Sequence, residues 1–112
     1  MAEKDFFEKV YEIVALIPSG KVTTYGAIAR VTGMRCSARM VGWALNSIDR
    51  DNYSPMGKNL PAHRVVNRNG ELTGKIHFAT PYFMREMLEA EGVEFIDEHV
   101  NMEKHLWLPL SD

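Results

Sequence analysis

An amphipathic segment near the start of the chain constrains the fold more than any other feature. Between Lys4 and Ile17, apolar residues recur at intervals of three and four, the spacing of one helix face. Pro18, Ser19 and Gly20 then interrupt the pattern. We predict one amphipathic helix here. At 112 residues, the chain is long enough for a single compact domain that covers the apolar face of this helix.

Two further short helices are predicted in the next part of the chain. Thr24 is placed to cap a helix that runs through Ala29 and stops at Gly33. Ser37 is placed to cap a third helix, which carries the apolar residues of 40–45. Two short helices joined by a tight turn indicate a helix-turn-helix unit, although plain core packing of adjacent helices gives the same pattern.

The middle of the chain is predicted to be irregular. Residues 49–60 are polar, include proline and glycine, and show no periodicity, so they indicate a loop. The short apolar run 61–66 is followed by Asn69 and Gly70, a pair that favours a tight turn with positive φ. A turn or small hairpin is expected there.

The last predicted helix has the clearest boundary signals. Thr80 and Pro81 supply a cap and a first-turn proline, and Gly92 stands just past the expected end. The tail from Val93 to Asp112 mixes acidic residues with aromatic ones. We expect these aromatic side chains to dock on the domain.

The composition indicates a soluble protein without cofactors. No apolar run approaches the roughly 20 residues of a membrane helix, and the charged N-terminus lacks the features of a secretory signal, so we expect a cytoplasmic protein and no membrane contact. Cys36 is the single cysteine and can form neither an internal disulfide nor a cysteine-rich zinc site. The histidines His77, His99 and His105 show no metal-ligand spacing. We expect no metal, no cofactor and, by default, a monomer.

The charges are unevenly distributed along the chain. Residues 20–75 carry nine Lys or Arg against three acids, a net charge of +6, whereas residues 1–19 sum to −2 and residues 76–112 to −6. A basic middle between acidic ends is typical of a nucleic-acid-binding face on an otherwise acidic protein. Scattered solvated charge is the alternative interpretation.

Four segments in one order resemble the O6-alkylguanine-DNA alkyltransferases, and in particular their short alkyltransferase-like branch. The segment 17–29 is similar to the opening of that family's DNA-binding domain, and 37–42 to its recognition helix. Pro-Ala-His-Arg-Val at 61–65 is similar to its active-site Pro-Cys-His-Arg-Val, and 89–92 to its closing helix.

This resemblance carries an expectation for the fold. It implies a mainly α-helical chain that forms one winged-helix-like, helix-turn-helix domain of the alkyltransferase C-terminal type, with a short hairpin. We expect this single DNA-binding domain to span 1–112, with the resemblance covering about 6–95 and a tail at 96–112.

The resemblance also implies how the chain would contact DNA. Tyr25 would press on a phosphate and help to rotate a nucleotide out of the duplex, and Arg39 would fill the space left in the base stack. Gly42 would permit close approach of the recognition helix to the minor groove. The flanking candidates are Ala38 and Met40. Without the family motifs, Tyr25 would be interpreted as a core residue and Arg39 as a solvated one.

The family reaction depends on a cysteine that takes up the alkyl group, and Ala62 stands at the matching position. Alanine has no nucleophilic atom, so alkyl transfer to this residue is chemically impossible. His63 and Glu91 match the pair that would otherwise activate the cysteine, and we expect them to hold the pocket wall. Arg64 is expected to hydrogen-bond backbone carbonyls and stiffen the active-site turn.

The resemblance implies a lesion pocket as well as a DNA-contacting helix. Pro61, Ala62 and His63 are the expected lesion pocket, with Asn46 as a further candidate. Trp43 is expected to be a core residue that faces inward. Cys36 is a poor substitute acceptor and is expected to be a small buried cysteine.

These observations leave three functional hypotheses. The leading one is a non-enzymatic sensor that flips and holds O6-alkylguanine in double-stranded DNA and marks it for nucleotide excision repair, a pathway that the resemblance alone implies. The second is a helix-turn-helix transcriptional regulator that binds undamaged DNA. The third is an enzyme that uses His63 and Glu91 for acid-base chemistry, for which no further catalytic group is evident.

Overall fold

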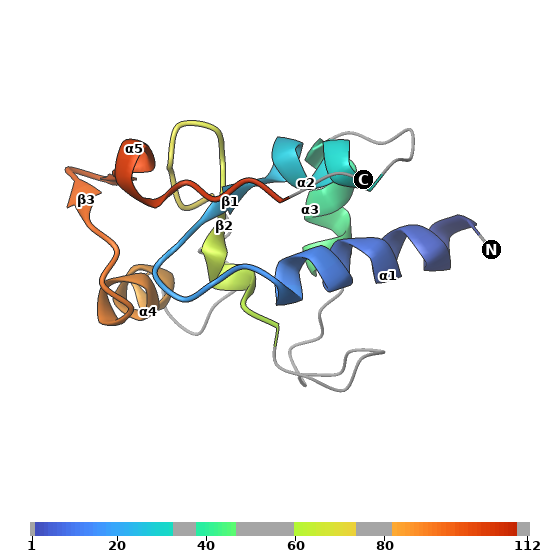
Figure 1. The fold of residues 1–112 in the computed structure, drawn as a ribbon, viewed down its shortest axis with the longest axis horizontal. Coiled ribbons are helices and arrows are strands. Elements are labelled where there is room, and N and C mark those ends of the chain that lie inside the picture. The colour runs from blue at the N-terminus through green and yellow to red at the C-terminus, as the bar shows by residue number, and fades with distance from the viewer. Residues whose placement is uncertain (1, 33–37, 47–59, 74–81, 110–112) are drawn as a thin grey trace.

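The computed structural model describes residues 2–32, 38–46, 60–73 and 82–109 (Figure 1). The helices are α1 (Ala2–Ala15), α2 (Tyr25–Val31), α3 (Ala38–Asn46), the 3-10 helix η1 (Ala62–Arg64), α4 (Phe83–Ala90) and α5 (Met102–His105). The strands are β1 (Thr23–Thr24), β2 (Val65–Val66), β3 (Phe95–Ile96) and β4 (His99–Val100). None of the described helices is long and apolar enough to cross a membrane.

The N-terminal amphipathic helix forms as predicted. It is α1, and its apolar positions Phe6, Val10 and Val14 are buried, because their spacing places them on one face. Ile17 is also buried, just after the helix ends and before Pro18. The α1 helix lies along one side of the molecule and packs against α2 and α3 (Figure 1).

The short helices α2 and α3 pack closely on each other, as a helix-turn-helix unit requires. Thr24 caps α2 as predicted: its side-chain oxygen accepts a hydrogen bond from the Ala27 amide at 3.0 Å. The predicted helix stop Gly33 and the predicted cap Ser37 lie outside the described residues, as do Cys36 and most of the predicted loop 49–60.

Of the two alternatives expected after 61–66, a turn or a small hairpin, the structure shows the turn, and the hairpin lies elsewhere. After η1, β2 does not turn back on itself but pairs in parallel with β1, in the register Thr23 to Val65 and Thr24 to Val66. The antiparallel hairpin is formed later, by β3 and β4 in the tail. A prediction from local sequence places a hairpin at the turn it detects, whereas β2 finds its partner 42 positions earlier in the chain.

The predicted turn after β2 is present. Gly70 has a φ of +83°, and its amide donates to the Asn67 carbonyl. A Cβ at this position would lie 2.8 Å from the Val100 carbonyl oxygen, so a glycine also permits close approach to β4. Asn67 further caps the turn by accepting from the amides of Asn69 and Glu71.

Helix α4 begins at Phe83 and ends as predicted before Gly92, whose φ is +91°. The predicted cap Thr80 and first-turn residue Pro81 lie outside the described residues. The tail docks as expected. Phe95 and Trp107 are both partly buried against the core, and the Trp107 amide donates to the Val22 carbonyl beside β1.

The buried apolar residues form two clusters. The helical cluster lies beneath α1, α2 and α3 and consists of Phe6, Val10, Tyr11, Ile13, Val14, Ile17, Ile28, Ala29, Val41, Ala44 and Val65. The strand cluster lies between β1, β2, α4 and the hairpin and consists of Val22, Val66, Met84, Leu88, Val93 and Val100. Because successive side chains of a strand point to opposite faces, Val65 belongs to one cluster and Val66 to the other.

One buried hydrogen bond joins α1 to α3. The Tyr11 hydroxyl donates to the Ala44 carbonyl at 2.8 Å, and burial raises the pKa of Tyr11, which keeps the phenol protonated.

Tyr11→Phe is expected to lower the free energy of unfolding by about 1–2 kcal/mol, because the buried carbonyl loses its side-chain donor. Urea unfolding measures this change. Tyr82→Phe, at a tyrosine that is 72% exposed, should change stability by less than about 0.5 kcal/mol; equal effects of the two would contradict the assignment.

Candidate nucleic-acid interface

The segment that resembles the active site forms a single tight turn. Pro61 precedes η1, and the Arg64 amide donates to the Pro61 carbonyl at 3.0 Å. Ala62 begins η1 and is partly exposed, whereas the next residue, His63, is only 6% exposed. The turn therefore leaves a methyl group near the surface and directs the imidazole into the protein.

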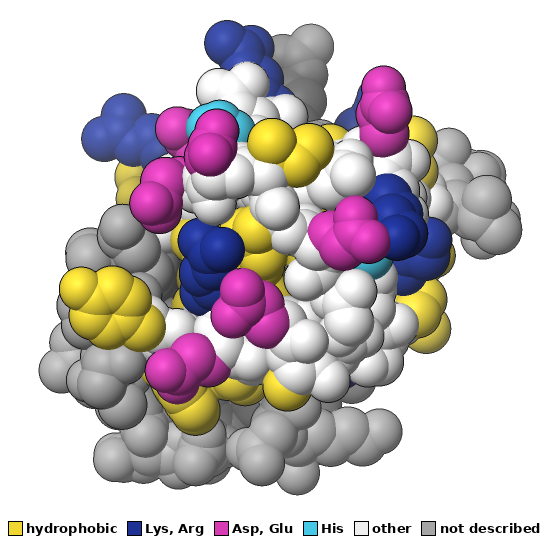
Figure 2. Space-filling view, turned by 90° about the vertical axis from the view of Figure 1, so that its left-hand side faces the viewer, with side chains coloured by type: hydrophobic (Ala, Val, Ile, Leu, Met, Phe, Trp, Pro, Cys, Tyr) yellow, Lys and Arg dark blue, Asp and Glu magenta, His cyan; other side chains and the backbone are white. Residues whose placement is uncertain are grey.

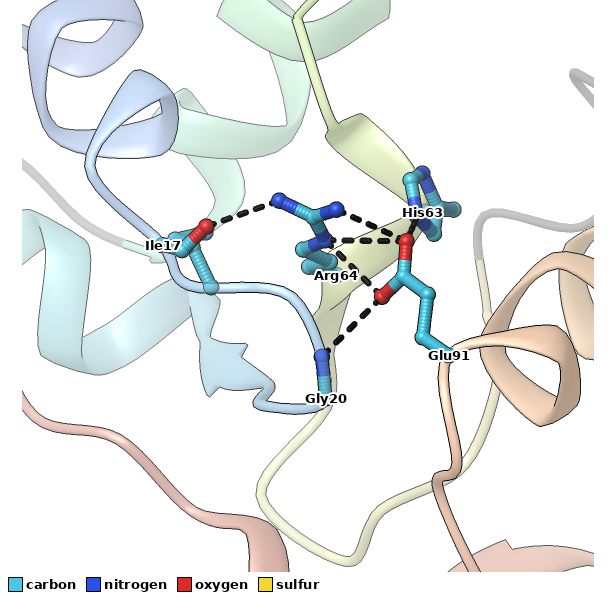
Figure 3. A network of polar contacts seen from close by, with 5 residues as sticks. All are labelled: Ile17, Gly20, His63, Arg64 and Glu91. Carbon is cyan, nitrogen blue, oxygen red and sulfur yellow. Dashed lines mark hydrogen bonds and ion pairs between the residues drawn. The ribbon is translucent and has the colours of Figure 1, made fainter.

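The Glu91 carboxylate, which follows α4, binds both this turn and the segment that carries Gly20 (Figure 3). Its Oε2 accepts from His63 Nε2 at 2.7 Å and from Arg64 Nη2 at 2.7 Å. Its Oε1 accepts from Arg64 Nε at 3.0 Å and from the Gly20 amide at 3.3 Å. Arg64 Nη1 donates in addition to the Ile17 carbonyl at 2.8 Å. The predicted His63–Glu91 pair and the predicted Arg64–carbonyl bond are both present.

The sequence did not reveal that Arg64 also pairs with Glu91. The guanidinium donates to both carboxylate oxygens, from Nε to Oε1 and from Nη2 to Oε2, an arrangement that only arginine provides. Both side chains are mostly buried, at 17% and 16% exposure. The charge of each therefore stabilises the other, and the Arg64 guanidinium is bound to Glu91 rather than directed at a phosphate.

The surroundings of Glu91 favour its ionised form. Burial alone would raise the pKa of this carboxyl. The hydrogen bonds from Arg64, His63 and the Gly20 amide outweigh burial and lower the pKa to about 2. A carboxylate only accepts hydrogen bonds, so His63 donates from Nε2. The network is thus arranged to fix the orientation of the imidazole.

His105 supports the same network from the tail, another contact that sequence reasoning missed. Its Nε2 accepts from the Glu94 amide at 3.0 Å, which places the ring proton on Nδ1, and Nδ1 donates to the Gly20 carbonyl at 2.9 Å. The Gly20 amide then donates to Glu91. No local motif could have revealed this contact, because His105 and Gly20 are 85 residues apart.

The exposed face of α3 carries the predicted DNA-contacting residues. Ala38 and Arg39 are exposed and Gly42 is partly exposed, whereas Val41 and Ala44 are fully buried. Met40 is half-buried against the helical cluster, so its contact with DNA stays a prediction. Asn46 is the last residue of α3.

The prediction that Trp43 faces the core is wrong. Its side chain is 53% exposed, and the Arg39 guanidinium carbon lies 5.7 Å from the centre of the indole ring. The two residues are four positions apart, which places them on the same side of α3. The inner positions of the helix are filled by smaller residues, Val41 and Ala44, on the side that packs against α1 and α2.

Tyr25 begins α2 and is half-buried against the helical cluster. Its hydroxyl accepts a hydrogen bond from Thr73 Oγ1 at 3.3 Å, so its polar tip reaches an exposed segment. The ring of Tyr25 therefore packs on the core, while its hydroxyl stands near the surface. Its contact with a DNA phosphate stays a prediction.

The charge distribution of the sequence is partly visible on the surface. Acidic side chains gather on the face that carries α4, the β3–β4 hairpin and α5 (Figure 2). Helix α3, with Arg39, lies toward the other end of the long axis (Figure 1). Among the described residues, no group of three or more His, Cys, Asp or Glu could hold a metal ion.

Residues 5–93 match the DNA-binding domain of the 6-O-methylguanine DNA methyltransferases. The chain belongs to this family. Alkyltransferase-like protein 1 of Schizosaccharomyces pombe is 35% identical over 114 residues, which cover 97% of this chain and 100% of that protein. The DNA base-flipping protein of Escherichia coli K12 is 39% identical over 108 residues, which cover 94% of this chain and 76% of that protein.

Solved structures show the same relationship. The crystal structure of S. pombe Atl1 in complex with damaged DNA containing O6-carboxymethylguanine matches with a TM-score of 0.75 at 35% identity, over 95% of this chain and 97% of that chain. The Mycobacterium tuberculosis OGT in complex with DNA matches with a TM-score of 0.61 at 34% identity, over 78% of this chain and 49% of that chain. The predicted fold class, a mainly helical alkyltransferase-like domain with a short hairpin, is confirmed.

The Glu91 network is expected to contribute to stability in a pH-dependent way. Glu91→Gln should lower the free energy of unfolding by about 2–3 kcal/mol at neutral pH, because the buried Arg64 loses its counter-charge. The pKa of Glu91 is lowered from 4.5 to about 2, so its contribution is complete above about pH 4.5 and is lost as the pH falls toward 2. Denaturant unfolding of both proteins across this range measures the difference.

A matched control is available two residues before Glu91, within α4. Glu89 is half exposed and pairs with Arg85 one turn away, so Glu89→Gln should change stability by less than about 0.5 kcal/mol at any of these pH values. A gap between wild type and Glu91→Gln that stays constant from neutral pH down to pH 2 would show that the carboxylate charge is not the stabilising element.

Proposed function

We propose that this chain is a non-enzymatic DNA lesion sensor, which binds O6-alkylguanine in double-stranded DNA and rotates it out of the helix without transferring the alkyl group. The observation that carries the proposal is Ala62 at the start of η1, beside a complete His63–Glu91–Arg64 network. The scaffold that would orient a reactive residue is present, and the reactive atom is absent.

The chemistry of Ala62 excludes alkyl transfer at this position. Transfer requires an electron pair that attacks the alkyl carbon, and a methyl group supplies none. His63 donates its Nε2 proton to Glu91 and is mostly buried, so its task in this chain is to support the pocket wall. Pro61, Ala62 and His63 are the proposed lesion pocket, with Asn46 at the end of α3 as a further candidate.

The DNA-contacting surface that we propose is the exposed face of α3 together with Tyr25. Arg39 is exposed and its flat guanidinium suits the space that a displaced base leaves. Flipping costs on the order of a few kcal/mol, and less for a badly paired base, which favours damaged sites. The likeness to S. pombe Atl1, whose structure holds DNA with O6-carboxymethylguanine, supports this assignment.

A sensor without chemistry must pass its lesion to another system. We propose nucleotide excision repair proteins as the recipients, on the basis of the family resemblance, and a monomer as the binding species. Pull-down of excision proteins by the sensor bound to lesion-containing DNA tests this step. If the proteins bind equally to lesion-containing DNA alone, the handover proposal fails while lesion binding stands.

The decisive experiment is fluorescence-anisotropy binding to matched duplexes that carry guanine or O6-methylguanine at one position. We expect at least about tenfold tighter binding of the modified duplex, measured at one fixed salt concentration because phosphate contacts weaken with salt. Equal affinity for the two would support the alternative, a helix-turn-helix regulator of undamaged DNA. Mass spectrometry of the protein after incubation should show no added alkyl group.

Gly42 gives a second test, in which stability and binding change in opposite directions. Nothing lies within 4 Å of the Cβ that an alanine would add, so Gly42→Ala should raise the free energy of unfolding by about 0.5–1 kcal/mol through higher helix propensity. The same methyl group would stand between α3 and DNA and is expected to weaken binding at least about fivefold. Unchanged binding by a stabilised variant would remove Gly42 from the interface.

A further inference from the structure

The exposed face of α3 carries a large aromatic side chain for which the function above gives no role. Trp43 is 53% exposed, although tryptophan is a residue that proteins usually bury for most of its area. It directly follows Gly42 and lies one helical turn after Arg39. The outer face of α3 therefore combines a cation, an indole and small residues.

We propose that Trp43 is a second DNA-contacting side chain, which stacks on the nucleotides beside the flipped base and so increases the preference for damaged DNA. The proposal rests on the proposed function and deepens it. In the DNA-free protein the indole holds Arg39, whose guanidinium carbon lies 5.7 Å from the ring centre. When Arg39 enters the base stack, that face of the indole becomes available to a base or a deoxyribose.

The strengths of the two contacts favour replacing the Arg39 guanidinium on the indole by a base. An exposed cation–π contact changes an equilibrium constant by about 2- to 5-fold, so releasing Arg39 from the indole has a small cost. Stacking of a base on an aromatic side chain contributes about 5- to 150-fold in affinity. The indole therefore gains more from a base than it loses with the guanidinium.

The surroundings of Trp43 fit nucleic acid better than protein. Helix α3 contains no acidic residue, and the described positions beside Trp43 on its outer side include the exposed Arg39 and the partly exposed Gly42, which are cationic and small. Small residues let a phosphate backbone approach the helix, and the cation attracts it. Helix α4 and the β3–β4 hairpin, whose sequences contain several acidic residues, lie toward the other end of the molecule from α3 (Figure 1).

The test compares Trp43→Ala, Trp43→Phe and a matched control in the anisotropy assay with guanine and O6-methylguanine duplexes. Trp43→Ala should weaken binding of the modified duplex by about 5- to 150-fold and that of the guanine duplex by less. Trp43→Phe keeps a stacking ring and should lose less than Trp43→Ala. Ile96→Ala truncates a 58% exposed residue of the hairpin and should leave both affinities unchanged.

Two further measurements distinguish stacking from a structural effect. In a Trp107→Phe background, emission from Trp43 should be quenched more by the modified duplex than by the guanine duplex. The combined Arg39→Ala and Trp43→Ala variant should lose more affinity than the product of the two single losses, by about 2- to 5-fold, because either single substitution already removes the Arg39–Trp43 contact that binding must break. Thermal unfolding checks that each variant is folded.

The outcomes separate this proposal from the one on which it rests. If wild-type protein binds both duplexes equally, the lesion-sensor function fails. If wild type prefers the modified duplex and Trp43→Ala keeps that preference, only the role of Trp43 is overturned. That role is also overturned if Trp43→Ala weakens binding of both duplexes equally, or if it abolishes self-association in ultracentrifugation and leaves DNA binding unchanged.

Discussion

The ion pair between Arg64 and Glu91 is the interaction that joins the two parts of this structure. Arg64 extends from η1 to the end of α1, which is packed in the helical cluster, while Glu91 follows α4, which is packed in the strand cluster. The strands β1 and β2 that lie between the clusters are two residues long and contribute few ladder bonds. A buried, doubly hydrogen-bonded pair with a directed geometry therefore fixes η1 against the end of α4 and the segment that follows α1.

This arrangement explains how a chain can keep the architecture of a reactive site and lack its chemistry. The groups that fix η1 are the His63 ring, the Arg64 guanidinium and the Gly20 amide, and each binds Glu91 rather than the side chain at position 62. Replacing a thiol by a methyl group at Ala62 thus removes no structural contact in the network. The turn keeps its hydrogen bonds, and the proposed function requires such preorganisation, since the bound base would be held rather than converted.

Much of the fold could be predicted because its signals are local. The spacing of Phe6, Val10 and Val14 indicates α1, and the hydroxyl of Thr24 marks the start of α2. The His63–Glu91 pair was predicted only through the family resemblance, since nothing local joins residues 28 positions apart. The Arg64–Glu91 pair, the His105–Gly20 bond and the β1–β2 pairing were missed for the same reason. Trp43 was misplaced because a general preference of tryptophan for the core outweighed the smaller residues that fill that side of α3.

The long reach of the His105–Gly20 contact has a consequence for the order of folding. The helical cluster is built mostly from segments near one another in the chain, and contacts of that kind form early because little loop entropy is lost. The Gly20 carbonyl, in contrast, binds His105, which is 85 residues later in the chain, and the Gly20 amide binds Glu91, which is 71 residues later. During synthesis, the local contacts of the helical cluster can therefore form before the turn that carries Ala62 is fixed by the tail. A nascent chain of this protein therefore packs its helices first and fixes the turn that carries Ala62 last.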